Sequence, residues 1–242
     1  MEQQMQFSFE RYEKKYLLTA AQQEFLLKEM RPHITADVYS NYSICNLYYD
    51  TDDWRLIRAS LEKPAYKEKL RVRSYGVPGK TDDVFVELKK KFDGIVYKRR
   101  ITIGIDEVAP FLNGDMPDGC YGQIGQELTW FQSFYRTEAR VFIGYDRQAF
   151  QGIEEPELRI TFDTNLRWRT TELALDKGDH GAPLTMPGDV LLELKLPGAC
   201  PLWLSRLLSE AGVFATSFSK FGSCYQNDLP LGEKAKGALC CA

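Results

Sequence analysis

The sequence predicts an α+β fold that is mostly antiparallel, with eight strands and fewer helices. Turn residues interrupt the chain at short intervals. Most segments between the turns alternate apolar and polar residues, which is the period of a half-buried strand. The 242 residues are enough for one large domain, and no repeat or linker divides them. We therefore expect one domain over residues 1–228, with a flexible tail over 229–242.

The expected strands share this alternation. In chain order they are Phe7–Leu17, Tyr42–Thr51, Tyr66–Tyr75, Val84–Lys91, Ile95–Ile103, Ala139–Phe150, Leu158–Thr164 and Val190–Leu196.

The expected helices interrupt the strands. Thr19 and Gln22 have the spacing of a capping box and open an amphipathic helix that ends near Arg31. Pro201 suits a first helical turn, and the helix that it begins ends before Gly212. The other helical segments are Asp106–Leu112, Ile124–Tyr135 and Ser217–Asn227. Within Ile124–Tyr135, the aromatic strip of Trp130, Phe131, Phe134 and Tyr135 has helical spacing and is expected to lie in the core.

Composition excludes several classes of protein. With 31 Lys and Arg against 34 Asp and Glu, the chain is slightly acidic, which argues against general nucleic-acid binding. No apolar run is long enough to span a membrane, and the first residues do not resemble a secretory signal, so we expect a cytoplasmic protein. The six cysteines form no C-x-x-C pair, and two histidines are too few for a histidine-rich metal centre.

Ionic side chains gather on one face of most expected strands. Because alternate residues of a strand share a face, the following sets each point one way. They are Arg11, Glu13 and Lys15; Lys69, Arg71 and Arg73; Glu87, Lys89 and Lys91; Lys98 and Arg100; Arg159, Thr161 and Asp163; and Glu193 and Lys195. The opposite faces carry apolar residues such as Leu70, Val72, Val84, Val86, Leu158, Ile160, Leu192 and Leu194.

Cations predominate on these faces although the whole chain is slightly acidic. Like charges on neighbouring strands repel unless an anion neutralises them, so the pattern favours a binding surface for a polyanion. An ordinary solvated sheet face is the alternative. If the sheet closes into a barrel with the charges inside, unpaired buried cations would cost several kcal/mol each. A wet tunnel for an extended anionic substrate is then the stable arrangement, and its glutamates could hold a divalent cation.

Several segments, taken in order, resemble a known family. They are Arg11-Tyr-Glu-Lys-Lys15, Leu47-Tyr-Tyr-Asp-Thr51, Lys69-Leu-Arg-Val-Arg73, Val86-Glu-Leu-Lys89, Tyr145-Asp-Arg-Gln-Ala-Phe150, Glu193-Leu-Lys-Leu-Pro-Gly198 and Ser219-Lys-Phe221. Together they resemble the VTC domain, the polyphosphate polymerase branch of the triphosphate tunnel metalloenzymes in the CYTH-like superfamily.

This resemblance implies an eight-stranded antiparallel β-barrel, the triphosphate tunnel fold, with helices packed outside. It implies a transferase that uses Mn²⁺ or Mg²⁺ to move the γ-phosphoryl group of ATP onto a growing polyphosphate chain. The expected partners are ATP, triphosphate and polyphosphate, with no nucleic acid and no membrane span in this chain. A membrane partner could exist unseen, and the oligomeric state is open.

The resemblance also assigns roles to residues. Arg71, Arg73, Lys89 and Glu193 would be catalytic, and Glu193, Glu13 and Glu87 would be metal ligands. The substrate-binding cations would be Arg11, Lys15, Lys69, Lys91, Lys98, Arg100, Arg140, Arg147, Arg159, Lys195 and Lys220. Phosphoryl transfer needs positioning and charge neutralisation, which Arg, Lys and a metal supply without histidine.

The chain departs from the hydrolytic CYTH pattern Glu-x-Glu-x-Lys, because Arg11 holds the place of the first glutamate. This argues against a thiamine-triphosphatase or adenylate-cyclase activity. The resemblance to eukaryotic relatives does not extend to an SPX domain or membrane helices. Two alternatives stay open: a tripolyphosphate or nucleoside-triphosphate hydrolase, and a non-catalytic module that binds polyphosphate.

Some residues have a simpler structural interpretation. Asp50 at a strand end is expected to form a turn or cap a helix. Asp163 shares a strand face with Arg159 and is expected to orient that side chain rather than bind metal. The faces of Lys90 and Lys98 are left open, because a register error of one residue would exchange them.

Overall fold

The computed structural model describes residues 12–93, 95–117 and 119–228. Its strands are β1 (Tyr12–Leu18), β2 (Ile34–Asp50), β3 (Tyr66–Tyr75), β4 (Asp83–Phe92), β5 (Ile95–Gly104), β6 (Glu138–Gly152), β7 (Arg159–Arg169), β8 (Ala182–Pro183) and β9 (Val190–Leu196). Its α-helices are α1 (Ala20–Met30), α2 (Arg55–Leu61), α3 (Val108–Asn113), α4 (Gly122–Tyr135), α5 (Leu202–Glu210) and α6 (Lys220–Ser223). Short turns of 3-10 helix cover Ile105–Glu107 and Leu175–Lys177, and a π-helical turn covers Cys224–Asp228.

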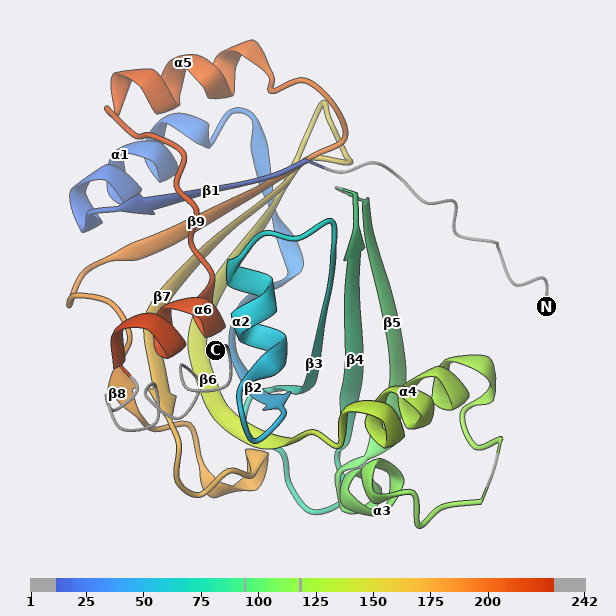
Figure 1. The fold of residues 1–242 in the computed structure, drawn as a ribbon. Helices are drawn as coiled ribbons and strands as arrows, with labels where there is room; N and C mark the ends of the chain where they lie inside the picture. Colours follow the sequence, from blue (N-terminus) through green and yellow to red (C-terminus); the bar gives the residue numbers. More distant parts are fainter. Residues whose placement is uncertain (1–11, 94, 118, 229–242) are drawn as a thin grey trace, which may run out of the picture. The chain divides into compact units, whose positions relative to one another are not determined.

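The α+β prediction is confirmed, and the described residues contain a strand at each of the eight expected places. Residues 7–11 of the first expected strand, Phe7–Leu17, lie outside the described residues. The strands belong to one nine-stranded sheet in the order β1-β9-β7-β6-β2-β3-β4-β5, with the two-residue β8 paired to β7 (Figure 1). β2 begins at Ile34, earlier than the predicted Tyr42, and helix α2 was not predicted. Closure of the sheet into a barrel stays a prediction, as does the single domain over 1–228. The tail over 229–242 lies outside the described residues.

The chain divides into two compact units. The first comprises residues 1–41, 147–164 and 188–217, as far as they are described. Here β9 pairs antiparallel with both β1 and β7. Alternate residues such as Ile160, Phe162 and Leu194 are buried in one apolar cluster with Leu26 of α1 and Leu204 of α5. The capping box predicted for α1 is present in this unit, where Thr19 accepts a hydrogen bond from the Gln22 amide.

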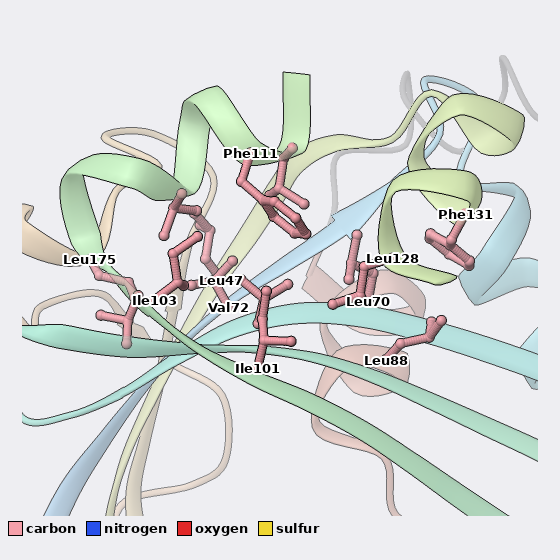
Figure 2. Close-up of a cluster of buried hydrophobic side chains, with 14 of the residues drawn as sticks. Leu47, Leu70, Val72, Leu88, Ile101, Ile103, Phe111, Leu128, Phe131 and Leu175 are labelled. Carbon is pink, nitrogen blue, oxygen red and sulfur yellow. The ribbon is translucent and has the colours of Figure 1, made fainter. Parts of the chain in front are cut away.

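The second unit comprises residues 42–146, 165–187 and 218–242, as far as they are described. Strands β3, β4 and β5 form antiparallel pairs in this unit. One face of these strands packs against α3 and α4. Figure 2 shows Phe111 of α3 and Phe131 of α4 among the sheet residues Leu70, Leu88 and Ile101. The opposite face of the same strands is therefore left for polar side chains.

The aromatic strip of α4 corrects one prediction. Phe131 is fully buried, but Trp130 and Phe134 are 57% and 56% exposed and stack on each other with ring centroids 5.2 Å apart. The helical spacing is confirmed, but α4 turns only one side to the sheet. The two residues lie one turn apart on its outer side, and each ring covers part of the other.

Asp50 and Trp54 shape the turn between β2 and α2. The fully buried Asp50 carboxylate accepts hydrogen bonds from the amides of Thr51, Leu56 and Ile57 at 2.8 to 2.9 Å. Burial raises the pKa of Asp50, and these hydrogen bonds offset only part of that rise. Trp54, just before α2, adopts a left-handed backbone conformation with φ of 62°. The predicted capping role of Asp50 is confirmed.

We expect the substitution Asp50→Ala to lower the free energy of unfolding by about 2 kcal/mol, because it leaves three buried amides without an acceptor. Urea unfolding followed by circular dichroism measures the change. Asp52→Ala is the matched control, since Asp52 is exposed two residues away. Equal stability of the two variants would contradict the capping role.

Candidate anion-binding site

Strands β3, β4 and β5 carry the predicted cationic face in the second unit. The register places Arg71 opposite Glu87 and Glu87 opposite Arg100. Further along the strands, Lys69 faces Lys89, and Lys89 faces Lys98. The register assigns a face to each of Lys90 and Lys98, which the sequence left open. Lys98 shares the face of Arg71 and Lys69. Lys90 lies on the opposite face, where it pairs with Glu127 of α4 at 2.5 Å.

Glu87 is the centre of this face. Its carboxylate is 1% exposed and lies within 2.6 to 4.0 Å of four cationic groups. Oε2 contacts Arg71 and Arg73, and Oε1 contacts Lys98 and Arg100. Burial by itself would raise the pKa of Glu87, but the charges of these neighbours outweigh it and hold the pKa well below its usual range. A single negative charge is therefore surrounded by four positive charges, which leaves a local excess of positive charge.

Polar and aromatic side chains orient the two arginines. The Arg73 Nε donates to Asn46 Oδ1 at 2.9 Å, and its NH2 group donates to the Tyr145 hydroxyl at 3.2 Å. The Arg71 NH1 group donates to the Tyr48 hydroxyl at 3.3 Å. Burial lowers the pKa of Arg71, but Tyr48 and Glu87 more than reverse this, so its pKa stays above normal. Both guanidinium groups are thus fixed in direction.

Lysines extend the cationic face beyond the arginines. Lys67 lies opposite Lys91, one step further along the strands than the Lys69–Lys89 pair. The pKa of Lys67 is lowered, first by burial and then by the positive charges of Lys91, Lys89 and Lys63. Like charges that face each other across strands destabilise a sheet. An anion bound along this row would relieve the repulsion.

A second cluster, in the first unit, lies on the polar face of β1, β9 and β7. The Lys15 ammonium is 3.1 Å from Glu13 and 3.5 Å from Glu193. The register places Lys15 opposite Glu193 and Glu13 opposite Lys195, so the two carboxylates are diagonal neighbours on one face. Glu193 also lies 3.5 Å from the Arg147 guanidinium.

Arg147 is held by Asp163 rather than left to rotate. The two side chains form a bidentate pair at 2.6 and 2.8 Å, and Asp163 is fully buried. This corrects one expectation, because Asp163 orients Arg147 and not Arg159. Arg159 donates instead to the carbonyl of Pro156 at 2.9 Å. The sequence placed Asp163 on the correct face, but it could not show which of two strands would supply its partner.

The other predicted substrate residues have varied surroundings. Lys220 is buried, with its ammonium 4.3 Å from the centre of the Tyr145 ring. Lys195 shares the face of Glu193. Arg140 lies over the Trp54 ring at 4.7 Å and donates to the Asp52 carbonyl, contacts that brace the turn before α2. Arg11 lies outside the described residues. The substrate roles of all of them stay predictions.

The carboxylates differ in how well they suit a metal ion. Among the described residues, no group of three or more His, Cys, Asp and Glu side chains is arranged to hold a metal. Glu13 and Glu193 both lie beside one cationic group, the Lys15 ammonium. Mg²⁺ is commonly bound by one or two carboxylates together with substrate phosphates, and this pair fits that requirement. Both oxygens of Glu87 contact cations, so its position favours charge compensation.

Sequence reasoning missed Tyr48, Asn46 and Tyr145 as partners of the arginines. Tyr48 and Asn46 alternate on β2 with the apolar Leu47, and both lie opposite the cationic residues of β3. The signal available in the sequence was this alternation within the segment Cys45–Asp50. The sequence indicates Tyr48 and Tyr145 only as parts of motifs, because their partners are distant along the chain.

The fold resembles that of solved structures. A proposed adenylate cyclase from Bacillus halodurans aligns with a TM-score of 0.53 and 14% identity, covering 87% of this chain and 95% of that one. A proposed adenylate cyclase from Vibrio parahaemolyticus has a TM-score of 0.47 and 12% identity, covering 91% of this chain and 99% of that one. No match was found among curated proteins. The first alignment supports an α+β fold of the triphosphate tunnel type.

The family follows from a separate comparison. The family model described as "VTC domain" matches residues 10–227. The chain therefore belongs to the VTC-domain family, and the resemblance stated from its sequence motifs is confirmed. No helix among the described residues is long and apolar enough to cross a membrane.

Proposed function

We propose that this protein is a metal-dependent polyphosphate polymerase that transfers the γ-phosphoryl group of ATP to a growing polyphosphate chain. Membership of the VTC-domain family supports a role in triphosphate binding or phosphoryl transfer. We place the activity in the cytoplasm, where ATP is available. The finer assignment, to a polymerase, depends on the length of the cationic face.

The supporting observation is the row of cations on β3, β4 and β5. From Lys67 to Arg73 the row covers about 20 Å at ~3.3 Å per residue. The arginine end, around Glu87, suits one compact phosphate group through bidentate contacts. The opposed lysines beyond it would give single charges to further phosphates of an extended chain. A site for free triphosphate alone would not require so long a row.

The chemistry requires few groups beyond these. The bond between the γ-phosphorus and the β–γ bridging oxygen breaks, and a terminal oxygen of polyphosphate forms the new bond to that phosphorus. The attacking oxygen is already anionic, so no general base is needed. Arg71, Arg73 and Lys89 would hold the phosphates and neutralise charge in the transition state. In the first unit, Glu193 and Glu13 would hold Mn²⁺ or Mg²⁺, which when bound supplies positive charge for phosphoryl transfer.

The test is to incubate the purified protein with ATP and Mn²⁺ and to follow phosphorus species by ³¹P NMR. We expect signals of internal polyphosphate phosphorus to grow together with ADP. Chelation of the metal and the substitution Arg73→Gln should each abolish both signals. Orthophosphate as the main product would contradict the proposal and indicate the hydrolase. Binding of polyphosphate without turnover would contradict it and indicate a binding module.

A further inference from the structure

Three consecutive residues, Ser219 to Phe221, connect to the cationic row. The first contacts a lysine of the row directly, and the other two contact tyrosines that hydrogen-bond its arginines. The Ser219 hydroxyl accepts a hydrogen bond from the Lys69 ammonium at 3.2 Å. The Lys220 ammonium lies over the ring of Tyr145 at 4.3 Å. Phe221 stacks on Tyr48 with ring centroids 4.9 Å apart. We call Ser219–Phe221 the clamp segment.

The two tyrosines connect the clamp segment to the arginines. The Tyr145 hydroxyl accepts from Arg73, and the Tyr48 hydroxyl accepts from Arg71. Each ring therefore contacts the clamp segment on its face and an arginine at its hydroxyl group. Together, three successive residues of the segment reach Lys69, Arg73 and Arg71, the cations that alternate along β3.

Trp54 also packs against the clamp segment and against Tyr225 beyond it. Its ring lies 6.2 Å from that of Phe221 and 5.7 Å from that of Tyr225. Trp54 is 5% exposed, and its left-handed backbone is set in the turn that Asp50 caps. Phe221 thus packs against both Tyr48 and Trp54 and is buried, so it has little freedom to move.

We propose that the clamp segment sets the direction of the Arg71, Arg73 and Lys69 side chains for phosphate binding, with Tyr48, Phe221 and Trp54 as positioning residues. The proposal rests on the proposed function, in which these cations hold phosphates. An arginine binds phosphate in two-point geometry, so a small error in its direction loses one of the two contacts. Arg71 and Arg73 share the single carboxylate of Glu87 with two further cations that repel them, so they need neutral partners to keep a defined arrangement.

The test compares two conservative substitutions. Tyr48→Phe removes the hydroxyl that holds Arg71 and keeps the ring that stacks on Phe221. Phe221→Leu removes the stacked ring and keeps an apolar side chain. We expect each to weaken the binding of inorganic tripolyphosphate, measured by calorimetry at 25 °C, about tenfold. Phe221→Tyr should restore affinity, and Tyr97→Phe, at an exposed tyrosine of β5, should not change it.

Thermal unfolding separates positioning from a general loss of stability. If Phe221→Leu lowers the melting temperature while both variants keep wild-type affinity well below it, the aromatic contacts are only structural and the proposal is wrong. An unchanged affinity of Tyr48→Phe alone would also overturn the link to Arg71.

A second measurement, made without ligand, tests the orienting role of the clamp segment independently of the proposed function. Without ligand, NMR of arginine Nε–H groups reports on the bond from Arg71 Nε to Glu87, which is 2.7 Å long. We expect faster exchange of this proton in Tyr48→Phe and Phe221→Leu. If wild-type protein binds no polyphosphate but this change occurs, the proposed function fails and the orienting role stands. If exchange is unchanged, the orienting role fails.

Discussion

The substitution Glu87→Gln is expected to lower the free energy of unfolding by about 3 kcal/mol. It leaves four cations around a neutral amide where a carboxylate with 1% exposure stood. Breaking a buried ion pair by removing one partner costs about 3–5 kcal/mol. We take the lower end because Lys98 and Arg100 are partly exposed, and solvent screens their charges.

Polyanion binding should reverse this loss. Tripolyphosphate supplies the negative charge that the substitution removes, so its addition should raise the melting temperature of Glu87→Gln more than that of the wild type. Glu127→Gln, which changes a carboxylate on the opposite face, serves as the control. Equal stabilisation of Glu87→Gln and wild type by tripolyphosphate would contradict the charge-compensation role. A variant of normal stability that had lost only its response to Mn²⁺ would show that Glu87 is a metal ligand.

The pH dependence of the free energy of unfolding is a further test of the role of Glu87. The folded pKa of Glu87 lies below its unfolded value, which is about 4.3 for glutamate. Its contribution to stability is therefore complete above that pH and is lost as the pH falls through the folded value. We expect the stability of the wild type to fall more steeply than that of Glu87→Gln below about pH 4. Parallel curves would contradict the pKa shift.

The strand faces could be predicted because alternation is a local property. The sequence places Arg71 and Arg73 on one face and Leu70 and Val72 on the other, and the structure agrees. The eight expected strands follow from the same reasoning. Helix α2 could not be predicted, because it begins after a left-handed Trp54 and depends on Asp50, a residue outside the helix.

Pairing across the sheet could not be predicted, because it depends on strand order. Asp163 has Arg159 near in sequence and on the same face, but its bidentate partner is Arg147 on β6. Similarly, nothing local indicates that Tyr48 would hold Arg71, since that contact depends on the β2–β3 register. The set of cations was therefore predictable, while the groups that orient them were not.

The second large effect is expected from Glu193→Gln, which should reduce metal-dependent turnover of ATP on the order of 100-fold. Glu193 is one of two carboxylates beside the Lys15 ammonium, and we propose that both hold the metal ion. A bound metal contributes several kcal/mol of charge stabilisation in phosphoryl transfer. Gln keeps the size of the side chain but loses the charge that attracts a divalent ion.

In contrast to turnover, the affinity of Glu193→Gln for tripolyphosphate in the absence of metal should increase. Glu193 lies 3.5 Å from both Lys15 and Arg147, so its removal leaves these cations less compensated. Tripolyphosphate should then bind Glu193→Gln more tightly than wild type when a chelator is present, because one repelling carboxylate is gone. Glu154→Gln, in an exposed turn of the same unit, should change neither quantity. Reduced turnover with equally reduced metal-free binding would indicate that Glu193 only maintains the fold, since the loss of a metal ligand should slow the reaction and strengthen metal-free anion binding.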